Sequence, residues 1–164
     1  MNMSKAGRGG RFKSSFRGLA LFAVMIAVIG LPGASARFWT DPNTGFAVGG
    51  YDTVAYFVES AARPGASEFE VSWNGQAWRF ANEGNRAVFI DNPEVYAPQF
   101  DGYGLVSVSR GLPAVGNPEI WEIYDNKLYF FHSRALRELW RKDSKSILSE
   151  ANRRWPEVEE KTRY

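Results

Sequence analysis

Apolar and polar residues alternate over residues 68–73, which is the period of a β-strand with one buried face. Asn74 and Gly75 follow, and this pair is typical of a type I′ hairpin turn because both central residues of that turn need positive φ. Trp78 and Phe80 then place two large rings on one face of a returning strand. The pattern predicts a β-hairpin with an aromatic face.

Most of this segment occurs twice. Residues 73–89 are matched by residues 124–140 at a constant offset. In each copy a turn pair leads into an aromatic strand, then a residue that can cap a helix, then a short helix that ends on an aromatic residue. Asn82 is the predicted N-cap of the first helix, and Ser133 is the predicted N-cap of the second.

The two copies differ in the strand before the turn. Trp121 and Ile123 lie one position out of phase with the apolar pair of the first copy, which predicts a changed register or a bulge. We expect both hairpins to join one antiparallel sheet with helices packed against it. The predicted fold class is α+β: a small single domain with antiparallel β-hairpins and short packed helices, built from two related hairpin-helix units.

Residues 49–57 lie upstream of the first hairpin and begin with two glycines that permit a tight entry. Asp52 is placed to cap a short helical turn, and aspartate is common at helix N-caps. The functional alternative is that Tyr51, Asp52 and Tyr56 line a pocket. We favour the cap.

Other short segments complete the expected organisation. Residues 105–109 are predicted to form a strand. Pro93 fits the first position of a single helical turn that Pro98 ends. Ser144 is a predicted cap for a last helix with apolar residues at helical spacing, which Pro156 is expected to stop.

The N-terminal segment has the pattern of an export signal. Basic residues precede an apolar run over residues 19–31, and Ala34, Ser35 and Ala36 form an A-x-A cleavage site. The run is shorter than the roughly 20 residues expected of a transmembrane helix, and no Arg-Arg pair precedes it as in a twin-arginine signal. We expect residues 1–36 to be a cleaved Sec-type signal peptide and the mature chain to be periplasmic or secreted. A retained membrane anchor is the alternative.

Removal of that signal changes the charge of the chain. Five of the 20 Lys and Arg residues, and none of the 18 Asp and Glu residues, precede Arg37, so 15 basic and 18 acidic residues remain. A slightly acidic protein lacks the basic surface on which nucleic-acid binding depends. We therefore expect no nucleic-acid partner, and no stable membrane insertion after signal cleavage.

The chain contains no cysteine, so the exported protein has no disulfide to stabilise it. The predicted domain, residues 37–164, is long enough to fold around a core of its own. Burial of its rings stabilises that core by roughly 25 cal/mol per Å² of apolar surface. Six tryptophans are predicted to belong to it: Trp39, Trp73, Trp78, Trp121, Trp140 and Trp155.

Dispersed motifs in this domain resemble the exported YHS-domain proteins. The motifs lie at residues 49–57, 73–81, 85–89, 93–99 and 102–103. The resemblance implies a small α+β YHS-like domain with a core at about 47–155. It also implies metal handling, because YHS domains occur attached to copper-transporting ATPases and to some hydroxylases.

The sequence departs from that family where metal binding would need it. Gly104 stands where exported relatives commonly have cysteine, and Met1, Met3 and Met25 all lie in the predicted signal peptide. Copper(I) prefers thiolate and thioether ligands. The mature chain would offer neither, so we expect no tight copper(I) binding by the monomer.

His132 is the one imidazole of the chain. It is a candidate metal ligand, a candidate general base for Ser133, or a ring with a structural hydrogen bond. Adjacent side chains on an extended backbone point to opposite faces, which disfavours pairing with Ser133. The matching residue of the first copy is Ala81, so we favour the structural interpretation.

Together these observations predict a non-catalytic exported module that binds a small ligand or a protein partner near Tyr51, Asp52, Tyr56 and Tyr103. Metal handling through His132 is the alternative by family analogy, and a hydrolase-type enzyme is a third candidate. No catalytic residue and no cofactor is predicted, and a metal ion would lack ligands.

Overall fold

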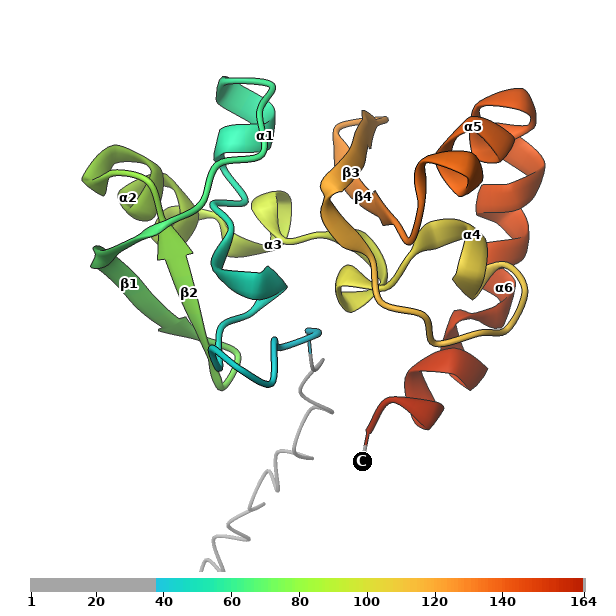
Figure 1. Cartoon of the computed structure of the whole chain (residues 1–164), viewed down its shortest axis with the longest axis horizontal. Helices are drawn as coiled ribbons and strands as arrows, with labels where there is room; N and C mark the ends of the chain where they lie inside the picture. Colours follow the sequence, from blue (N-terminus) through green and yellow to red (C-terminus); the bar gives the residue numbers. More distant parts are fainter. Residues whose placement is uncertain (1–37, 164) are drawn as a thin grey trace, which may run out of the picture. The chain divides into compact units, whose positions relative to one another are not determined.

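The computed structural model describes residues 38–163, which belong to one compact unit (Figure 1). The predicted signal peptide, residues 1–36, lies outside the described residues. Short helices and antiparallel strand pairs alternate along the chain, which confirms the predicted α+β class. In chain order the elements are η1 (Val48–Gly50), α1 (Ala55–Val58), β1 (Ala66–Trp73), β2 (Gln76–Phe80), α2 (Glu83–Asp91), α3 (Pro93–Tyr96), η2 (Gln99–Gly102), α4 (Leu105–Val108), β3 (Asn117–Tyr124), β4 (Lys127–Phe131), α5 (Arg134–Lys142) and α6 (Ser144–Lys161).

The first hairpin, β1–β2, forms where the sequence predicts it. Asn74 and Gly75 have φ of 53° and 76°, the positive values that a type I′ turn requires. Asn82 caps α2 by accepting a hydrogen bond from the backbone N–H of Asn85 at 2.8 Å. The turn, the strands and the cap are therefore confirmed.

The second hairpin, β3–β4, repeats the first in register. Tyr124 pairs with Lys127 beside the turn, as Trp73 pairs with Gln76 in the first copy. Each hairpin has one register shift, between Ala66 and Glu70 in β1 and at the matching place in β3. Of the two predicted alternatives, the irregularity is present in β3, but it lies at the matching place in β1, so the pairing register does not differ between the copies.

The strands form two separate two-stranded sheets, so the prediction of one antiparallel sheet is wrong for residues 38–163. The reason lies in the second hairpin, which is buried on both faces. Leu128 and Phe130 belong to one hydrophobic core, whereas Tyr129 and Phe131 belong to another. Packing on both faces stabilises this hairpin without edge-to-edge pairing to the first hairpin.

Burial on both faces also explains the phase difference between the copies. Tyr124 contacts Trp140 of α5 with ring centroids 5.3 Å apart, just as Trp73 contacts Phe89 of α2 at 5.6 Å, so the helix-facing side is kept. Trp121 lies on the opposite face and packs against the first core. Additional apolar residues in β3 therefore serve a second contact surface.

The repeat extends upstream of the hairpins. In the first copy Gly50 accepts a backbone hydrogen bond from Gly65 at 2.8 Å, and in the second Gly102 accepts one from Gly116 at 3.0 Å. A short helix follows in each case, α1 in the first copy and α4 in the second. The strand predicted at 105–109 is therefore wrong, since a run of four buried residues, three of them apolar, does not distinguish strand from helix.

The last helix, α6, contains Pro156, so the predicted stop at this proline is wrong. Asp143, not Ser144, occupies its N-cap position. Proline removes one backbone hydrogen bond from the helix. The helix continues because Ala151 and Val158, on either side of Pro156, are both buried in the second core, and tertiary packing stabilises it. No helix within residues 38–163 is long and apolar enough to cross a membrane.

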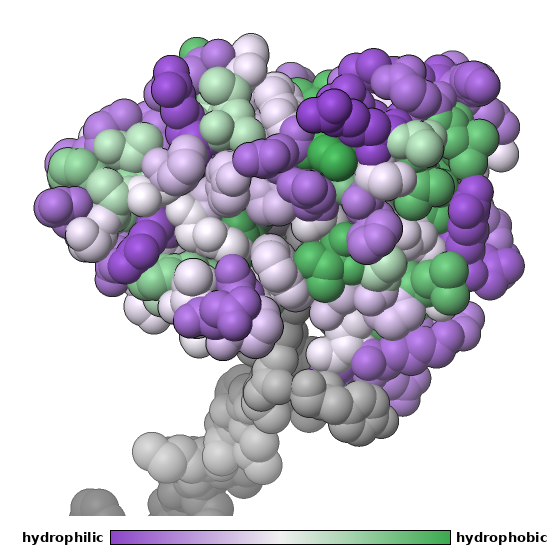
Figure 2. Space-filling model, in the orientation of Figure 1, coloured by the Kyte–Doolittle hydropathy of each residue, from purple (hydrophilic) through white to green (hydrophobic). Residues whose placement is uncertain are grey.

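Two clusters of buried residues make up the interior. The first core consists of Phe38, Ala47, Val48, Val54, Tyr56, Trp78, Phe80, Phe89, Ala97, Leu128 and Phe130. The second consists of Phe100, Leu105, Val106, Val108, Tyr129, Phe131, Trp140, Ala151 and Val158. On the face drawn in Figure 2, hydrophobic residues form small groups separated by polar ones.

Candidate functional site

Asp52, a predicted ligand-binding residue, is fully buried and holds the first copy together. Its Oδ1 accepts hydrogen bonds from the backbone N–H groups of Val54 at 2.9 Å and Ala55 at 3.1 Å, which confirms the predicted cap of α1. Its Oδ2 accepts from the backbone N–H of Ala81 at 2.8 Å and from Asn85 Nδ2 at 2.7 Å. These four donors satisfy the carboxylate and give it a structural role.

Tyr56 is also buried, and it joins α1 to the second hairpin. Its hydroxyl donates a hydrogen bond to the carbonyl of Pro118 at 2.8 Å, and its ring lies 5.0 Å from Trp121 and 5.5 Å from Phe130. Burial raises the pKa of Tyr56 well above its ordinary value. Half-buried Tyr51 donates to Glu119 Oε1 at 3.1 Å beside it.

Tyr103 lies apart from these residues. Its ring packs against Trp155 of α6 at 6.3 Å, and it lines a cleft of about 590 Å³ together with Gln76 and Thr162. Tyr51 and Tyr56 bond to the start of β3, and Tyr103 packs on α6, so the predicted site residues divide into two groups.

His132 is exposed and bonds to the backbone. Its Nδ1 lies 2.9 Å from the carbonyl oxygen of Val115, which can only accept, so Nδ1 carries the hydrogen. The neutral ring then presents Nε2 as an acceptor. Within residues 38–163 no group of three or more His, Cys, Asp or Glu side chains could hold a metal ion.

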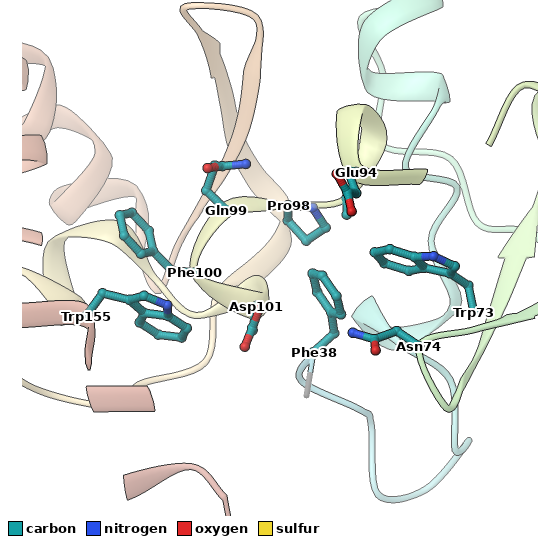
Figure 3. A pocket seen from close by; sticks show the side chains of 10 residues that line it. Phe38, Trp73, Asn74, Glu94, Pro98, Gln99, Phe100, Asp101 and Trp155 are labelled. Carbon is teal, nitrogen blue, oxygen red and sulfur yellow. The ribbon is translucent and has the colours of Figure 1, made fainter. Parts of the chain in front are cut away.

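A second cleft, next to the one that Tyr103 lines, has a volume of about 680 Å³ (Figure 3). We call it the aromatic cleft. Residues of both copies and of α6 line it: Phe38, Trp73, Asn74, Glu94, Ala97, Pro98, Gln99, Phe100, Asp101 and Trp155.

Aromatic rings form two walls of this cleft. Phe38 and Trp73 pack together with centroids 5.4 Å apart on one side. Phe100 and Trp155 pack together at 5.5 Å on the other. In Figure 3 the carboxylate of Asp101 lies between these two pairs of rings.

Asp101 has three unusual properties. Its φ is 52°, a left-handed conformation that few residues other than glycine adopt, and the matching position in the first copy is Gly49 with φ of 63°. The side chain belongs to a residue only 8% exposed, yet within residues 38–163 its carboxylate has no hydrogen bond or ion pair. Aspartate tolerates this backbone conformation. A carboxylate without a partner in a largely buried residue is the feature found preferentially at functional sites.

The surroundings of Asp101 raise its pKa to about 6, chiefly because burial disfavours the charged form. The nearby carboxylate of Glu159 raises the pKa further, and the Arg163 guanidinium lowers it. Arg163 is paired with Glu159 at 3.0 Å and forms no ion pair with Asp101, so its effect on Asp101 is only a weaker, longer-range attraction. Glu94 adds a second carboxylate to the cleft, and none of its described lining residues is basic.

Few features of the sequence indicate this site. Asp101 falls in the glycine-punctuated segment before Gly102, and Trp155 has the spacing of an ordinary core residue of a helix. One signal was present: Asp101 stands where the first copy has Gly49. That substitution becomes visible only after the repeat is extended upstream of the hairpins.

Scans against protein-family models, curated proteins and solved structures each found no match for this chain. The site is therefore interpreted from its own geometry.

Proposed function

We propose that this protein is a non-catalytic exported binding module and that the aromatic cleft holds its ligand. The observation that carries the proposal is a cleft of about 680 Å³ lined by four aromatic rings together with four polar side chains, those of Asn74, Glu94, Gln99 and Asp101. Small-molecule sites commonly have volumes of roughly 300–1,000 Å³ and combine aromatic side chains with a few polar groups that fix the orientation of the ligand. The cleft is thus suited to a small molecule.

A binding role fits the lining better than a catalytic one. The described lining residues include no Ser, Cys, Lys or His, so no hydroxyl, thiol or amine nucleophile with an imidazole base faces the cleft. His132 is hydrogen-bonded to Val115 and is not part of the lining. Asn74, Gln99 and the two carboxylates are groups that orient a ligand.

Export and family membership are parts of the same proposal. The basic segment, apolar run and A-x-A site before Arg37 support export. A YHS-type domain is supported by the motifs at residues 49–57, 73–81, 85–89, 93–99 and 102–103. The ligand would then be taken up outside the cytoplasm.

A pair of variants at Gln99 tests the proposal. The Gln99 side chain lines the cleft and has no hydrogen bond within residues 38–163, so Gln99→Trp should fill the cleft without removing a contact. Gln99→Ala keeps the cleft open and is the matched control. Thermal unfolding would be followed with panels of amines, carboxylates, sugars and aromatic compounds, because a ligand that binds only the folded state raises the midpoint.

We expect at least one class to stabilise the wild type and Gln99→Ala and to lose its effect on Gln99→Trp. If no class stabilises the wild type, or if Gln99→Trp responds like the wild type, the cleft is not the binding site.

A second candidate, metal handling, is favoured by one observation: Nε2 of exposed His132 is available as a ligand. Such a site would take zinc or copper(II) weakly, with carboxylates as hard co-ligands. Calorimetric titration of zinc into the wild type and His132→Ala tests this candidate. Equal heats from both proteins would exclude His132 as a ligand.

A further inference from the structure

The aromatic cleft combines features that narrow its ligand to one chemical class. Resting on the proposed function, we propose that it binds an organic cation, an amine or quaternary ammonium compound whose apolar groups contact the rings and whose charge faces Asp101. Four observations support this inference: the unpaired carboxylate, the absence of a basic residue in the described lining, the rings on both sides, and the backbone conformation of Asp101.

The described lining of the cleft carries negative charge only. Asp101 and Glu94 both line it, and no lysine or arginine among the described lining residues neutralises them. Glu159 adds negative charge beside Asp101, while Arg163 is held by Glu159. The Asp101 carboxylate belongs to a largely buried residue and has no partner within residues 38–163, so it is less well solvated than in water, and a cation that enters the cleft offsets that cost.

The aromatic rings of the cleft also favour a cation. The face of an aromatic ring carries negative charge density and attracts a cation, most strongly for tryptophan. Trp73 with Phe38 and Trp155 with Phe100 supply two such pairs on opposite sides of Asp101 in Figure 3. An inorganic cation would pair with the carboxylates and make few favourable contacts with these rings. An alkylammonium group would pair with the carboxylates and also pack its apolar groups against the rings.

The backbone conformation around Asp101 is shared by both copies of the repeat. Val48, Gly49 and Gly50 of η1 have φ of 56°, 63° and 78°, and the matching residues Phe100, Asp101 and Gly102 of η2 have φ of 54°, 52° and 85°. The same left-handed segment is thus built twice. Glycine occupies the central position without strain in one copy, and an aspartate occupies it in the other. A Cβ at Gly49 would lie 3.6 Å from Trp39, an ordinary contact, so space does not dictate the choice.

Choline and its neutral isostere 3,3-dimethylbutan-1-ol provide the test, because they share shape and differ in charge. Calorimetric titration of each into the purified protein should show choline binding at least about tenfold tighter, a difference of about 1.4 kcal/mol. Asp101→Asn keeps the side-chain shape and tolerates positive φ, and it should weaken choline binding about tenfold or more. Glu160→Gln, which removes one exposed carboxylate of α6, is the matched control and should leave binding unchanged.

The pH gives an independent readout, since choline keeps its charge at every pH. The carboxylate of Asp101, with its pKa near 6, loses most of its charge below that value. Choline affinity should therefore fall about tenfold between pH of about 7.5 and about 5. The same change of pH should leave binding of the neutral isostere unaltered.

Each other outcome has a definite meaning. Equal binding of choline and its isostere, or stabilisation by sugars and not by ammonium compounds, would overturn the inference and leave the binding module in place. Equal weakening by Asp101→Asn and Glu160→Gln would reduce the effect to general surface charge and overturn it as well. Failure of every compound to bind, or unchanged binding to Gln99→Trp, would instead refute the proposed function.

Discussion

Substitution of Asp101 by asparagine should make the ligand-free protein more stable at neutral pH. The residue is 8% exposed and carries a carboxylate without a partner within residues 38–163. Burial of that charge is unfavourable. Asparagine has nearly the same shape, tolerates the φ of 52° and carries no charge, so the substitution removes the unfavourable term alone.

The size and the pH dependence of the effect follow from the pKa. Burial raises the pKa of Asp101 from 3.8 to about 6 in the folded protein, and one pKa unit corresponds to about 1.4 kcal/mol, so the gain at neutral pH is at most about 3 kcal/mol, an upper limit that solvent screening of the partly exposed carboxylate reduces. Between those two values the folded state binds more protons than the unfolded state. Wild-type stability from this group is therefore fully present below pH of about 4 and is lost as the pH rises through about 6. The advantage of Asp101→Asn should be absent at pH of about 3.5 and complete above about 6.5.

Urea unfolding followed by tryptophan fluorescence measures this difference, since the chain contains six tryptophans. The free energy of unfolding of the wild type, Asp101→Asn and the control Glu160→Gln would be compared at several pH values. Glu160→Gln should show no such pH-dependent gain. A gain that is the same at every pH, or a loss of stability at neutral pH, would show that Asp101 is not an unpaired buried charge.

Three further predictions address the rest of the chain. Gly75→Val should destabilise the protein by about 1–2 kcal/mol: a side chain at this position would meet no neighbour, but valine poorly adopts the φ of 76°. Gly75→Asn should cost less, and unchanged unfolding of the valine variant would contradict the type I′ turn. Asp52→Ala should destabilise the protein by about 3 kcal/mol or more, since it leaves four donors without their acceptor. The stability of Asp52→Asn should lie between those of Asp52→Ala and the wild type, and if the two variants unfold in urea at the same concentration, the structural role of the carboxylate is refuted. Intact-mass measurement of the exported protein should find Arg37 at its N-terminus, and a full-length product would refute cleavage after Ala36.

Local features of the fold were predictable because short-range chemistry determines them. The Asn74-Gly75 turn, the Asn82 and Ser133 caps and the Asp52 cap each depend on residues within a few positions of one another. Such turns and caps have distinctive residue requirements. Both hairpins and the helices that follow them were therefore placed correctly.

Features that depend on distant contacts were not predictable in the same way. The phase of Trp121 was interpreted within its own hairpin, whereas its ring packs against Tyr56 of α1 at 5.0 Å. The course of α6 past Pro156 likewise depends on burial of its apolar face in the second core. Neither partner can be identified from the spacing of residues within one element.

The candidate site shows how duplication separates structural from functional residues. Both copies need a left-handed segment before the Gly-Tyr pair, and the first copy meets that need with Gly49 while the second has Asp101. In the first copy the carboxylate comes later, at Asp52, where four hydrogen bonds satisfy it. The second copy has Gly104 there and places its carboxylate at Asp101, without a partner in the described chain. The first copy thus contains a satisfied carboxylate and the second an unpaired one, and the proposed organic cation would supply the charge that Asp101 lacks.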